Sequence, residues 1–171
     1  LRTPLTRLKL QLALLKQTDL AKKMSDDIEE MERMLNEYLE FARYQKKEET
    51  ETVNVYEMVN DVVKKYESAE INTTIEKDLK ISARSNSIKR CLTNLIDNGL
   101  AYGKKVEISA KNISNNLIIF VDDDGPGIDQ KEYQNVIKPF YRIDKSRGQN
   151  KSGVGLGLSI ANDIIRSHGG N

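Results

Sequence analysis

The most informative segment of this chain is Leu117-Ile118-Ile119-Phe120-Val121-Asp122-Asp123-Asp124-Gly125-Pro126-Gly127. Its five apolar residues predict a well-buried strand, and the glycines and proline that follow predict a turn. Three adjacent carboxylates repel one another, so this strand end is unfavourable unless it serves a ligand. Asp124 offers a carboxylate to an amino group, and Gly125 and Gly127 allow the backbone to approach a flat ligand closely. The alternative is that Asp-Gly-Pro-Gly forms only a turn.

Upstream of this segment, Asn94 and Asn98 lie four residues apart in a stretch with helical periodicity. That spacing puts both amides on one face of a helix. Their side-chain oxygens can bind a hard cation such as Mg²⁺, which often shares its oxygen ligands with substrate phosphates. An isolated pair of this kind can also do no more than bridge buried backbone groups.

Downstream, Gly153, Gly155 and Gly157 open the last predicted helix. Glycines at this place expose backbone N–H groups, and a helix N-terminus attracts phosphate. The pattern is not a Rossmann fingerprint, because no strand precedes it, and not a Walker loop, because no Gly-Lys-Ser/Thr ends it. The preceding segment 138–151 is basic and contains Arg142 and Arg147. It is either a disordered loop or a mobile lid whose cations meet phosphates.

The periodicity of the remaining residues after position 53 predicts mixed helices and strands. Helices are expected at 58–66, 88–101, 129–137 and 156–167, and strands at 71–75, 79–81, 106–110 and 117–121. This mixture predicts an α/β sandwich with helices on one face of a sheet.

The first 46 residues differ, because their apolar positions alternate by steps of three and four. One series is Leu1, Leu5, Leu8, Leu12 and Leu15, and the other is Met24, Ile28, Met31, Leu35, Tyr38 and Ala42. The spacing predicts two helices, with Pro4 at the start or a bend of the first and Thr18 or Asp19 as N-cap of the second. The short break between them predicts an antiparallel hairpin, and two hairpins would form a homodimeric four-helix bundle. Packing of both helices on the rest of the same chain is the alternative.

Composition and charge narrow the class of protein further. The 27 basic and 26 acidic residues give a net charge of +1, which argues against a nucleic-acid partner. No apolar run approaches the roughly 20 residues of a membrane helix, and a single cysteine favours a reducing compartment. The polar run 46–51 predicts a linker at 47–52 between domains at 1–46 and 53–171. Because the first residue is Leu1, we expect a piece of a longer protein.

Together and in this order, the motifs resemble the cytoplasmic catalytic core of a bacterial sensor histidine kinase. Residues 1–5 resemble the downstream part of its H-box, 94–98 its N-box, 122–128 its first glycine box, 139–142 its F-box and 153–158 its second glycine box. The segments Leu-Arg-Thr-Pro-Leu-Thr-Arg at 1–7 and Ser-Ile-Lys-Arg at 87–90 look closest to the osmosensor, EnvZ-like kinases. The implied fold class is α+β, with a dimerisation and histidine-phosphotransfer hairpin followed by an α/β sandwich. That sandwich would be the ATP-binding domain of the gyrase, chaperone and histidine-kinase type.

The resemblance implies ATP and Mg²⁺ as cofactors and assigns a role to each motif. The implied nucleotide-binding residues are Asn94, Asn98, Tyr102, Asp124, Gly125, Gly127, Gly153, Gly155, Gly157 and Leu158, with Asn98 as the Mg²⁺ ligand. Within that set, Asp124 would take the adenine amino group and Asn94 would support the phosphates. Arg142 and Arg147 would serve the γ-phosphate side as catalytic residues. Thr3 matches the position that assists dephosphorylation of the regulator, the alternative being a plain polar residue at a helix start.

The implied partners are a second copy of the chain, through the hairpin, and the receiver domain of a response regulator. In the family the phosphoryl group passes from ATP to a histidine two residues before the position of Leu1, and then to an aspartate of the regulator. An acidic residue one before the Leu1 position activates that histidine. The implied location is the cytoplasmic side of the bacterial inner membrane, with membrane attachment only through segments upstream of this sequence.

Three positions depart from the family pattern. His168 is the one histidine of the sequence, and because its surroundings do not match the H-box we expect an exposed helix-end residue, not the phosphoacceptor. Gly99 stands at a helical position where the family usually has alanine, at a cost of about 1 kcal/mol. Family members continue with about two more strands after the position of Asn171, so we expect an open sheet edge.

Two other functions stay open at this stage. An ATP hydrolase of the same fold needs a base that activates water, and Asp97 is the only carboxylate between Ser85 and Ala101. That scarcity favours transfer of the phosphoryl group over hydrolysis. A catalytically inactive remnant, by contrast, would only dimerise or bind nucleotide. Transfer of label from γ-labelled ATP distinguishes these functions.

Overall fold

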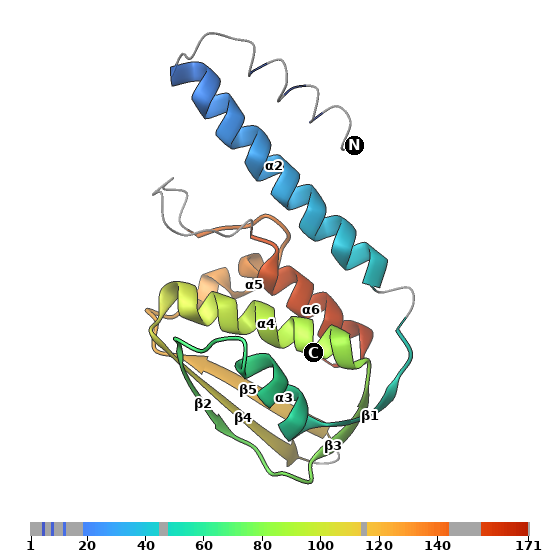
Figure 1. The fold of residues 1–171 in the computed structure, drawn as a ribbon. Coiled ribbons are helices and arrows are strands. Elements are labelled where there is room, and N and C mark those ends of the chain that lie inside the picture. The colour runs from blue at the N-terminus through green and yellow to red at the C-terminus, as the bar shows by residue number, and fades with distance from the viewer. Residues whose placement is uncertain are drawn as a thin grey trace. The chain divides into compact units, whose positions relative to one another are not determined.

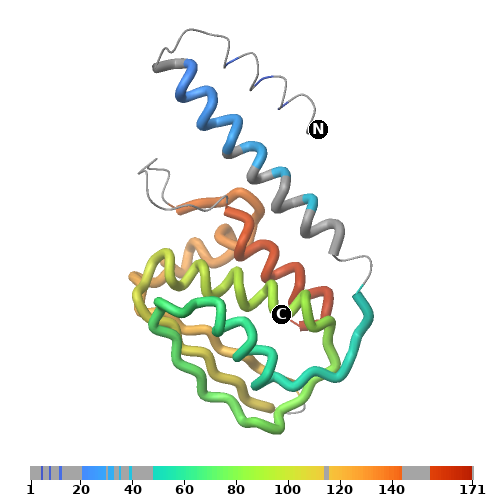
Figure 2. The backbone as a smooth tube through the Cα atoms, viewed as in Figure 1, coloured from blue at the N-terminus to red at the C-terminus, as the bar shows by residue number. Residues whose placement is uncertain are grey.

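The computed structural model divides into two compact units, Leu1–Arg43 and Tyr44–Asn171. The residues that it describes are Leu5, Leu8, Leu12, 19–44, 48–113, 116–143 and 155–170. Figure 1 labels the elements, and Figure 2 traces the backbone from the first unit into the second. The predictions for Thr3, Pro4, Thr18, Arg147 and Gly153 lie outside the described residues. Each unit is described by itself.

The first unit contains the long helix α2, Asp19–Tyr44. Leu5 and Leu12, which are helical, form a buried cluster with Ile28 of α2, and Leu35 packs against it. These residues come from the two series with steps of three and four, so the two stripes meet within one chain. Other members of the same series are exposed, among them Leu8 at 44%, Met24 at 44% and Met31 at 52%. The dimeric bundle stays a prediction.

The second unit has two small sheets. Strands β1 (Glu51–Asn54) and β3 (Lys80–Ala83) pair antiparallel, and β2 (Glu70–Thr74), β4 (Lys105–Ile113) and β5 (Asn116–Asp123) form a sheet in the order β2-β4-β5. Strand β2 is parallel to β4, and β5 is antiparallel to it, with Val106 opposite Asp123. Strands β2, β3, β4 and β5 match the four predicted strands within a few residues, whereas β1 was not predicted.

The helices of this unit are α3 (Val55–Val63), α4 (Ser85–Tyr102), α5 (Tyr133–Val136) and α6 (Gly157–Ser167), with a 3₁₀ turn at Gln130–Glu132 before α5. The expected single helix at 129–137 is therefore a 3₁₀ turn followed by a short helix. Asn54 caps α3, because its side chain accepts a hydrogen bond from the backbone N–H of Glu57 at 3.0 Å. None of the described helices is long and apolar enough to cross a membrane.

The core of the second unit lies between the helices and one face of the β2-β4-β5 sheet. Its buried members include Met58, Val59 and Val62 of α3, Ile88, Cys91, Leu92 and Ile96 of α4, Val106 and Ile108 of β4, and Ile160 and Ile164 of α6. Steps of three and four put these α4 residues on one stripe of the helix. Figure 1 shows α4 and α6 side by side, and the Cys91 thiol lies 3.8 Å from the carbonyl oxygen of Ala161 between them. The expected α/β arrangement is confirmed for this unit.

The prediction of a well-buried strand at 117–121 is wrong. Strand β5 is paired only with β4 in the described part of the chain, and its residues alternate between half-buried and exposed. Ile118 and Phe120 are 38% and 39% exposed. The apolar run misled because both faces of an edge strand can be apolar even when helices cover only one of them.

The expected linker at 47–52 also contains ordered structure. Strand β1 begins at Glu51, and the carboxylate of Glu48 accepts hydrogen bonds from the first turn of α4. The acidic run around Glu48 is therefore more than a solvated stretch.

Candidate functional site

Helix α4 carries the two asparagines that the sequence singled out. Asn94 and Asn98 are both half-buried and lie four residues apart on it. The side-chain nitrogen Nδ2 of Asn94 is buried and has no hydrogen-bond partner in the described structure. A buried donor without a partner costs about 1–3 kcal/mol. This orphaned donor therefore points to a ligand that supplies the missing acceptor.

The first residue of α6 lies beside this asparagine. A Cβ atom added at Gly157 would lie 3.9 Å from the Cβ of Asn94 and 4.0 Å from its Oδ1. The first backbone N–H groups of a helix have no partners within it, and the helix dipole favours an anion there. An amide donor and a helix N-terminus thus meet at one place, which suits a phosphate group. Leu158, also predicted for this site, is half-buried in the same turn of α6.

The end of β5 lies close to α4 at Gly99. A Cβ atom added there would lie 3.0 Å from Cγ2 of Val106 and 3.2 Å from Cβ of Asp123. Both distances are shorter than ordinary carbon contacts, so the glycine permits the close approach of the helix to the sheet. The expected cost of a helical glycine is therefore offset by this packing.

Asp123, the last residue of β5, and Asp124, which follows it, have different partners. Asp123 is paired with Val106, which is fully buried under the helices, so its side chain is on the helix-covered face. Asp124 follows the last residue of β5, and its Oδ1 accepts hydrogen bonds from the backbone N–H groups of Lys104 at 2.6 Å and Lys105 at 2.9 Å. These bonds lower the pKa of Asp124. Asp124 thus holds the backbone that joins α4 to β4, and Asp123 lies against Gly99 within α4.

Sequence reasoning missed Asp123, although a signal for it was present. Side chains alternate between the faces of a strand, and the buried positions Val106 and Ile108 of β4 fix which face is inside. Their partners Asp123 and Val121 must share that face. Register, not the order of the acids along the chain, separates Asp123 from Asp124.

The glycine turn after β5 supports the end of α4. A Cβ atom added at Gly125 would lie 3.2 Å from the backbone carbonyl carbon and oxygen of Tyr102. The N–H of Gly125 donates to Oδ1 of Asp123 at 2.8 Å. Tyr102 is 43% exposed, and Gly127, with a φ of +71°, has open space where a side chain would begin. The structure therefore brings Tyr102, Asp123 and Gly125 together, with Gly127 in the same turn.

Phe140 and Gly155 are joined by a backbone hydrogen bond. The N–H of Phe140 donates to the carbonyl oxygen of Gly155 at 2.9 Å. Both residues have a positive φ, of 64° and 77°. A Cβ atom added at Gly155 would lie 2.8 Å from the carbonyl oxygen of Tyr141, so only glycine fits here. Arg142, which follows, is half-buried.

The histidine prediction needs a correction, because His168 is half-buried and hydrogen-bonded. Its Nε2 accepts from the backbone N–H of Arg84 at 3.1 Å and from the side-chain Nε–H at 3.3 Å, while its Nδ1 lies 2.7 Å from the carbonyl oxygen of Ile164. A neutral ring with the proton on Nδ1 satisfies all three contacts. His168 therefore fastens the end of α6 to the start of α4.

Asp97, the candidate base for hydrolysis, has a structural partner. Its carboxylate accepts a hydrogen bond from the phenol of Tyr66 at 2.7 Å. Burial, and then this hydrogen bond, raise the pKa of Tyr66. The bond holds the carboxylate to the segment that follows α3.

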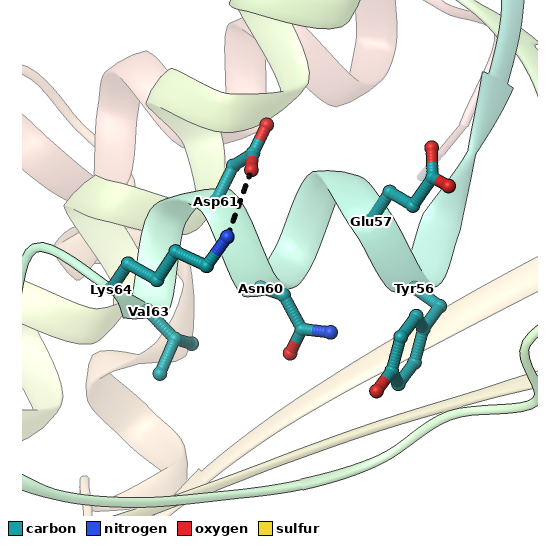
Figure 3. A pocket seen from close by; sticks show the side chains of 6 residues that line it. All are labelled: Tyr56, Glu57, Asn60, Asp61, Val63 and Lys64. Carbon is teal, nitrogen blue, oxygen red and sulfur yellow. Dashed lines mark ion pairs between the residues drawn. The ribbon is translucent and has the colours of Figure 1, made fainter.

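A separate hollow of about 500 Å³ lies along α3. It is lined by Tyr56, Glu57, Asn60, Asp61, Val63 and Lys64, none of which was predicted as a site residue. Figure 3 shows Tyr56 and Asn60 on one side of the helix and the ion pair of Asp61 with Lys64, at 3.9 Å, on the other. Within the described residues there is no group of three or more histidines, cysteines or acids that could hold a metal ion.

Comparison with known proteins assigns the family. A family profile matches residues 83–171, more than half of the chain. The chain belongs to the histidine kinase-, DNA gyrase B- and HSP90-like ATPase family. The matched part of this ATPase domain contains α4, the end of β5 and the start of α6, which build the candidate site.

Individual relatives of this ATPase domain are sensor kinases. The sensor histidine kinase GtrS of Pseudomonas aeruginosa is 31% identical over 172 residues, covering 99% of this chain and 36% of that protein. The sensor histidine kinase CpxA of Escherichia coli is 30% identical over 184 residues, covering 99% and 40%. The chain thus spans about two fifths of the length of these curated relatives.

Solved structures agree with this family. The histidine kinase domain of the Escherichia coli osmosensor EnvZ is 28% identical, with a TM-score of 0.55, and covers 74% of this chain and 80% of that one. The resemblance to sensor histidine kinases that the sequence motifs indicated is confirmed.

Proposed function

We propose that this chain binds Mg-ATP and transfers the γ-phosphoryl group to a histidine, for relay to an aspartate of a response regulator. The ATPase family and the names of the relatives support this function. Within the chain, the observation that carries the proposal is the orphaned Nδ2 of Asn94 beside the N-terminus of α6. A phosphate oxygen supplies the acceptor that this donor lacks.

The other residues of the site fit a bound nucleotide. The amide oxygen of Asn98 suits Mg²⁺, which prefers oxygen ligands and takes several of them from phosphates. For the adenine amino group, the geometry favours Asp123 over the predicted Asp124, because the Oδ1 of Asp124 already accepts two backbone hydrogen bonds. Tyr102 would flank the nucleotide, and Gly125 would keep the turn close to it.

The reaction is a phosphoryl transfer in which positioning and charge neutralisation matter most. A nitrogen of the acceptor imidazole forms a bond to the γ-phosphorus, the bond from that phosphorus to the β,γ-bridging oxygen breaks, and ADP leaves. Arg142 and Arg147 would offset negative charge on the transferred group, and Mg²⁺ held at Asn98 would supply further charge neutralisation. Charged hydrogen bonds of this kind are about twice as strong as neutral ones.

His168 is not the acceptor in this proposal, because both ring nitrogens have partners within the chain. We propose instead an acceptor histidine on a helical hairpin, and a homodimer of hairpins that covers exposed apolar residues such as Met24 and Met31. Thr3 would assist dephosphorylation of the regulator. The proposed location is the cytoplasmic side of the inner membrane, and a net charge of +1 is consistent with a partner other than nucleic acid.

Titration calorimetry with Mg-ADP tests the nucleotide site. Asn94→Ala and Asn98→Ala should each weaken binding at least tenfold, because each removes a contact to phosphate or metal. Asn60→Ala is the matched control, since Asn60 lies on α3 and lines the separate hollow, not the proposed nucleotide site. A folded wild-type chain that gives no heat with Mg-ADP refutes the proposed function.

Labelled ATP tests the transfer step. The chain should transfer label from γ-labelled ATP to a separately supplied hairpin that contains the acceptor histidine. It should show little steady hydrolysis, because Asp97 is bound to Tyr66. Steady ATP turnover that disappears in Asp97→Asn would indicate a hydrolase instead, and an unlabelled hairpin despite Mg-ADP binding would indicate an inactive remnant.

A further inference from the structure

The first turn of α4 is capped by a residue from a distant part of the chain. Its own N-cap residue, Arg84, makes no capping hydrogen bond with its side chain. Instead, the carboxylate of Glu48 accepts from the backbone N–H of Asn86 at 2.5 Å through Oε1 and from that of Ser87 at 3.0 Å through Oε2. The Ser87 hydroxyl also donates to Oε2 at 2.6 Å. One carboxylate thus satisfies two N–H groups that the helix itself leaves without partners.

The chemistry of this contact, at a half-buried residue, favours a strong interaction. Hydrogen bonds from backbone N–H groups to a carboxylate are charge-assisted. The negative charge also lies at the positive end of the helix dipole, where it is stabilising. Glu49, the next residue, is exposed and carries the same charge without such a contact in the described structure.

The capped helix is the one that holds the candidate site. At 1.5 Å per residue, Asn94 lies about 10 Å and Asn98 about 16 Å along the helix from Ser87. The same end of α4 is also fastened to α6, because the Arg84 guanidinium donates to the carbonyl oxygen of Ser167 at 2.9 Å. The start of α6 is beside Asn94. A shift of the capped end therefore changes the position of the site residues.

Glu48 also stands at a particular place in the sequence. Only residues 45–47 separate it from Tyr44, the last residue of α2. A chain of four residues spans at most about 14 Å. Glu48 is therefore joined to the end of α2 by a short covalent segment.

We propose that Glu48 is a positioning residue that ties the segment between α2 and β1 to the first turn of α4. Through this tie, the conformation of that segment controls how well Asn94 and Asn98 are placed for Mg-nucleotide. The inference rests on the proposed function and adds to it a route by which the first unit influences nucleotide binding. The residue acts through α4 and does not touch the nucleotide.

Amide exchange and calorimetry on the full chain test this proposal, with Glu48→Ala, Glu48→Gln and the control Glu49→Ala. Backbone amide exchange at Asn86 and Ser87, followed by NMR, should speed up at least tenfold in Glu48→Ala and stay unchanged in Glu49→Ala. Mg-ADP affinity, measured by calorimetry where circular dichroism shows every variant folded, should fall about fivefold to tenfold in Glu48→Ala. Glu48→Gln retains an acceptor oxygen and should fall between wild type and Glu48→Ala.

The outcomes separate this inference from the proposed function. A purely structural cap would lower the resistance of the chain to urea but leave the Mg-ADP affinity of the folded protein unchanged, and that result overturns the inference. Unchanged amide exchange in Glu48→Ala overturns it as well. If the wild type and Glu49→Ala do not bind Mg-ADP, the proposed function fails, and the positioning role fails with it.

Discussion

Three glycines near the site offer a graded test of how the backbone is held. Gly155 and Gly127 both have a positive φ, of 77° and 71°. A Cβ atom at Gly155 would lie 2.8 Å from the carbonyl oxygen of Tyr141, whereas one at Gly127 would meet nothing within 4 Å. At Gly157 the φ is ordinary for a helix and the nearest atoms, those of Asn94, lie at 3.8 Å or beyond. Alanine at each position therefore isolates a different effect.

The magnitudes follow from these contacts. Alanine at Gly127 should cost about 1 kcal/mol, because left-handed backbone is unfavourable by about 1–2 kcal/mol and the stiffer unfolded chain returns part of that. Alanine at Gly155 has the same conformational cost, and the overlap of its Cβ atom with the backbone adds about 2 kcal/mol, so the total destabilisation is about 3 kcal/mol. Alanine at Gly157 should stabilise by about 0.5 kcal/mol through helix propensity.

Urea unfolding followed by tyrosine fluorescence measures these differences. Six of the seven tyrosines lie in the second unit, since only Tyr38 is in the first, so the signal reports mainly the unit under test. With a slope of about 2 kcal/mol/M, the midpoint of Gly155→Ala should lie about 1 M below that of Gly127→Ala. Equal costs for the two variants, or a cost below about 1 kcal/mol for Gly155→Ala, would refute the close approach of Phe140 and Gly155.

Three further predictions concern titrating groups. Burial raises the pKa of the Cys91 thiol to about 11, so at pH 8 iodoacetamide should alkylate this single cysteine at least about 100-fold more slowly in the folded than in the urea-unfolded chain. Burial and the Asp97 hydrogen bond raise the pKa of Tyr66, so the stabilisation that this phenol gives to the fold is full below about pH 10 and is lost as the pH rises further. The difference in urea midpoint between wild type and Tyr66→Phe should therefore shrink from about pH 9 to 11. The hydrogen bonds from Lys105 and Lys104 lower the pKa of Asp124, so the contribution of its carboxylate to the free energy of unfolding is present above about pH 4 and is lost as the pH falls further. Acid unfolding should therefore be less steep in Asp124→Asn than in wild type. A rapidly alkylated Cys91, a pH-independent Tyr66→Phe difference or an unchanged acid profile would each contradict the corresponding contact.

The sequence was informative wherever a local pattern is itself the physical cause of the structure. Helix α4 follows from apolar residues at steps of three and four, and the placement of Asn94 and Asn98 on one face follows from the same period. Glycine at the start of α6 is likewise readable, because exposed N–H groups at a helix N-terminus need no tertiary partner to attract phosphate. These local rules were enough to indicate the family.

Contacts between distant residues could not be read in this way. The choice between Asp123 and Asp124 depends on the register of β5 against β4, and the burial of β5 depends on which of its faces the helices cover. The partners of His168 and Glu48 lie 84 and 38 residues away, where no local period applies.

The sequence by itself determined most of the helices and strands of the second unit and indicated the family of the chain. Only the tertiary structure decided which acid faces α4, that His168 joins two helices and that Glu48 caps the helix of the site. The reason is physical: backbone propensity and side-chain period act over a few residues, whereas hydrogen bonds across the fold form only after packing has brought their partners together.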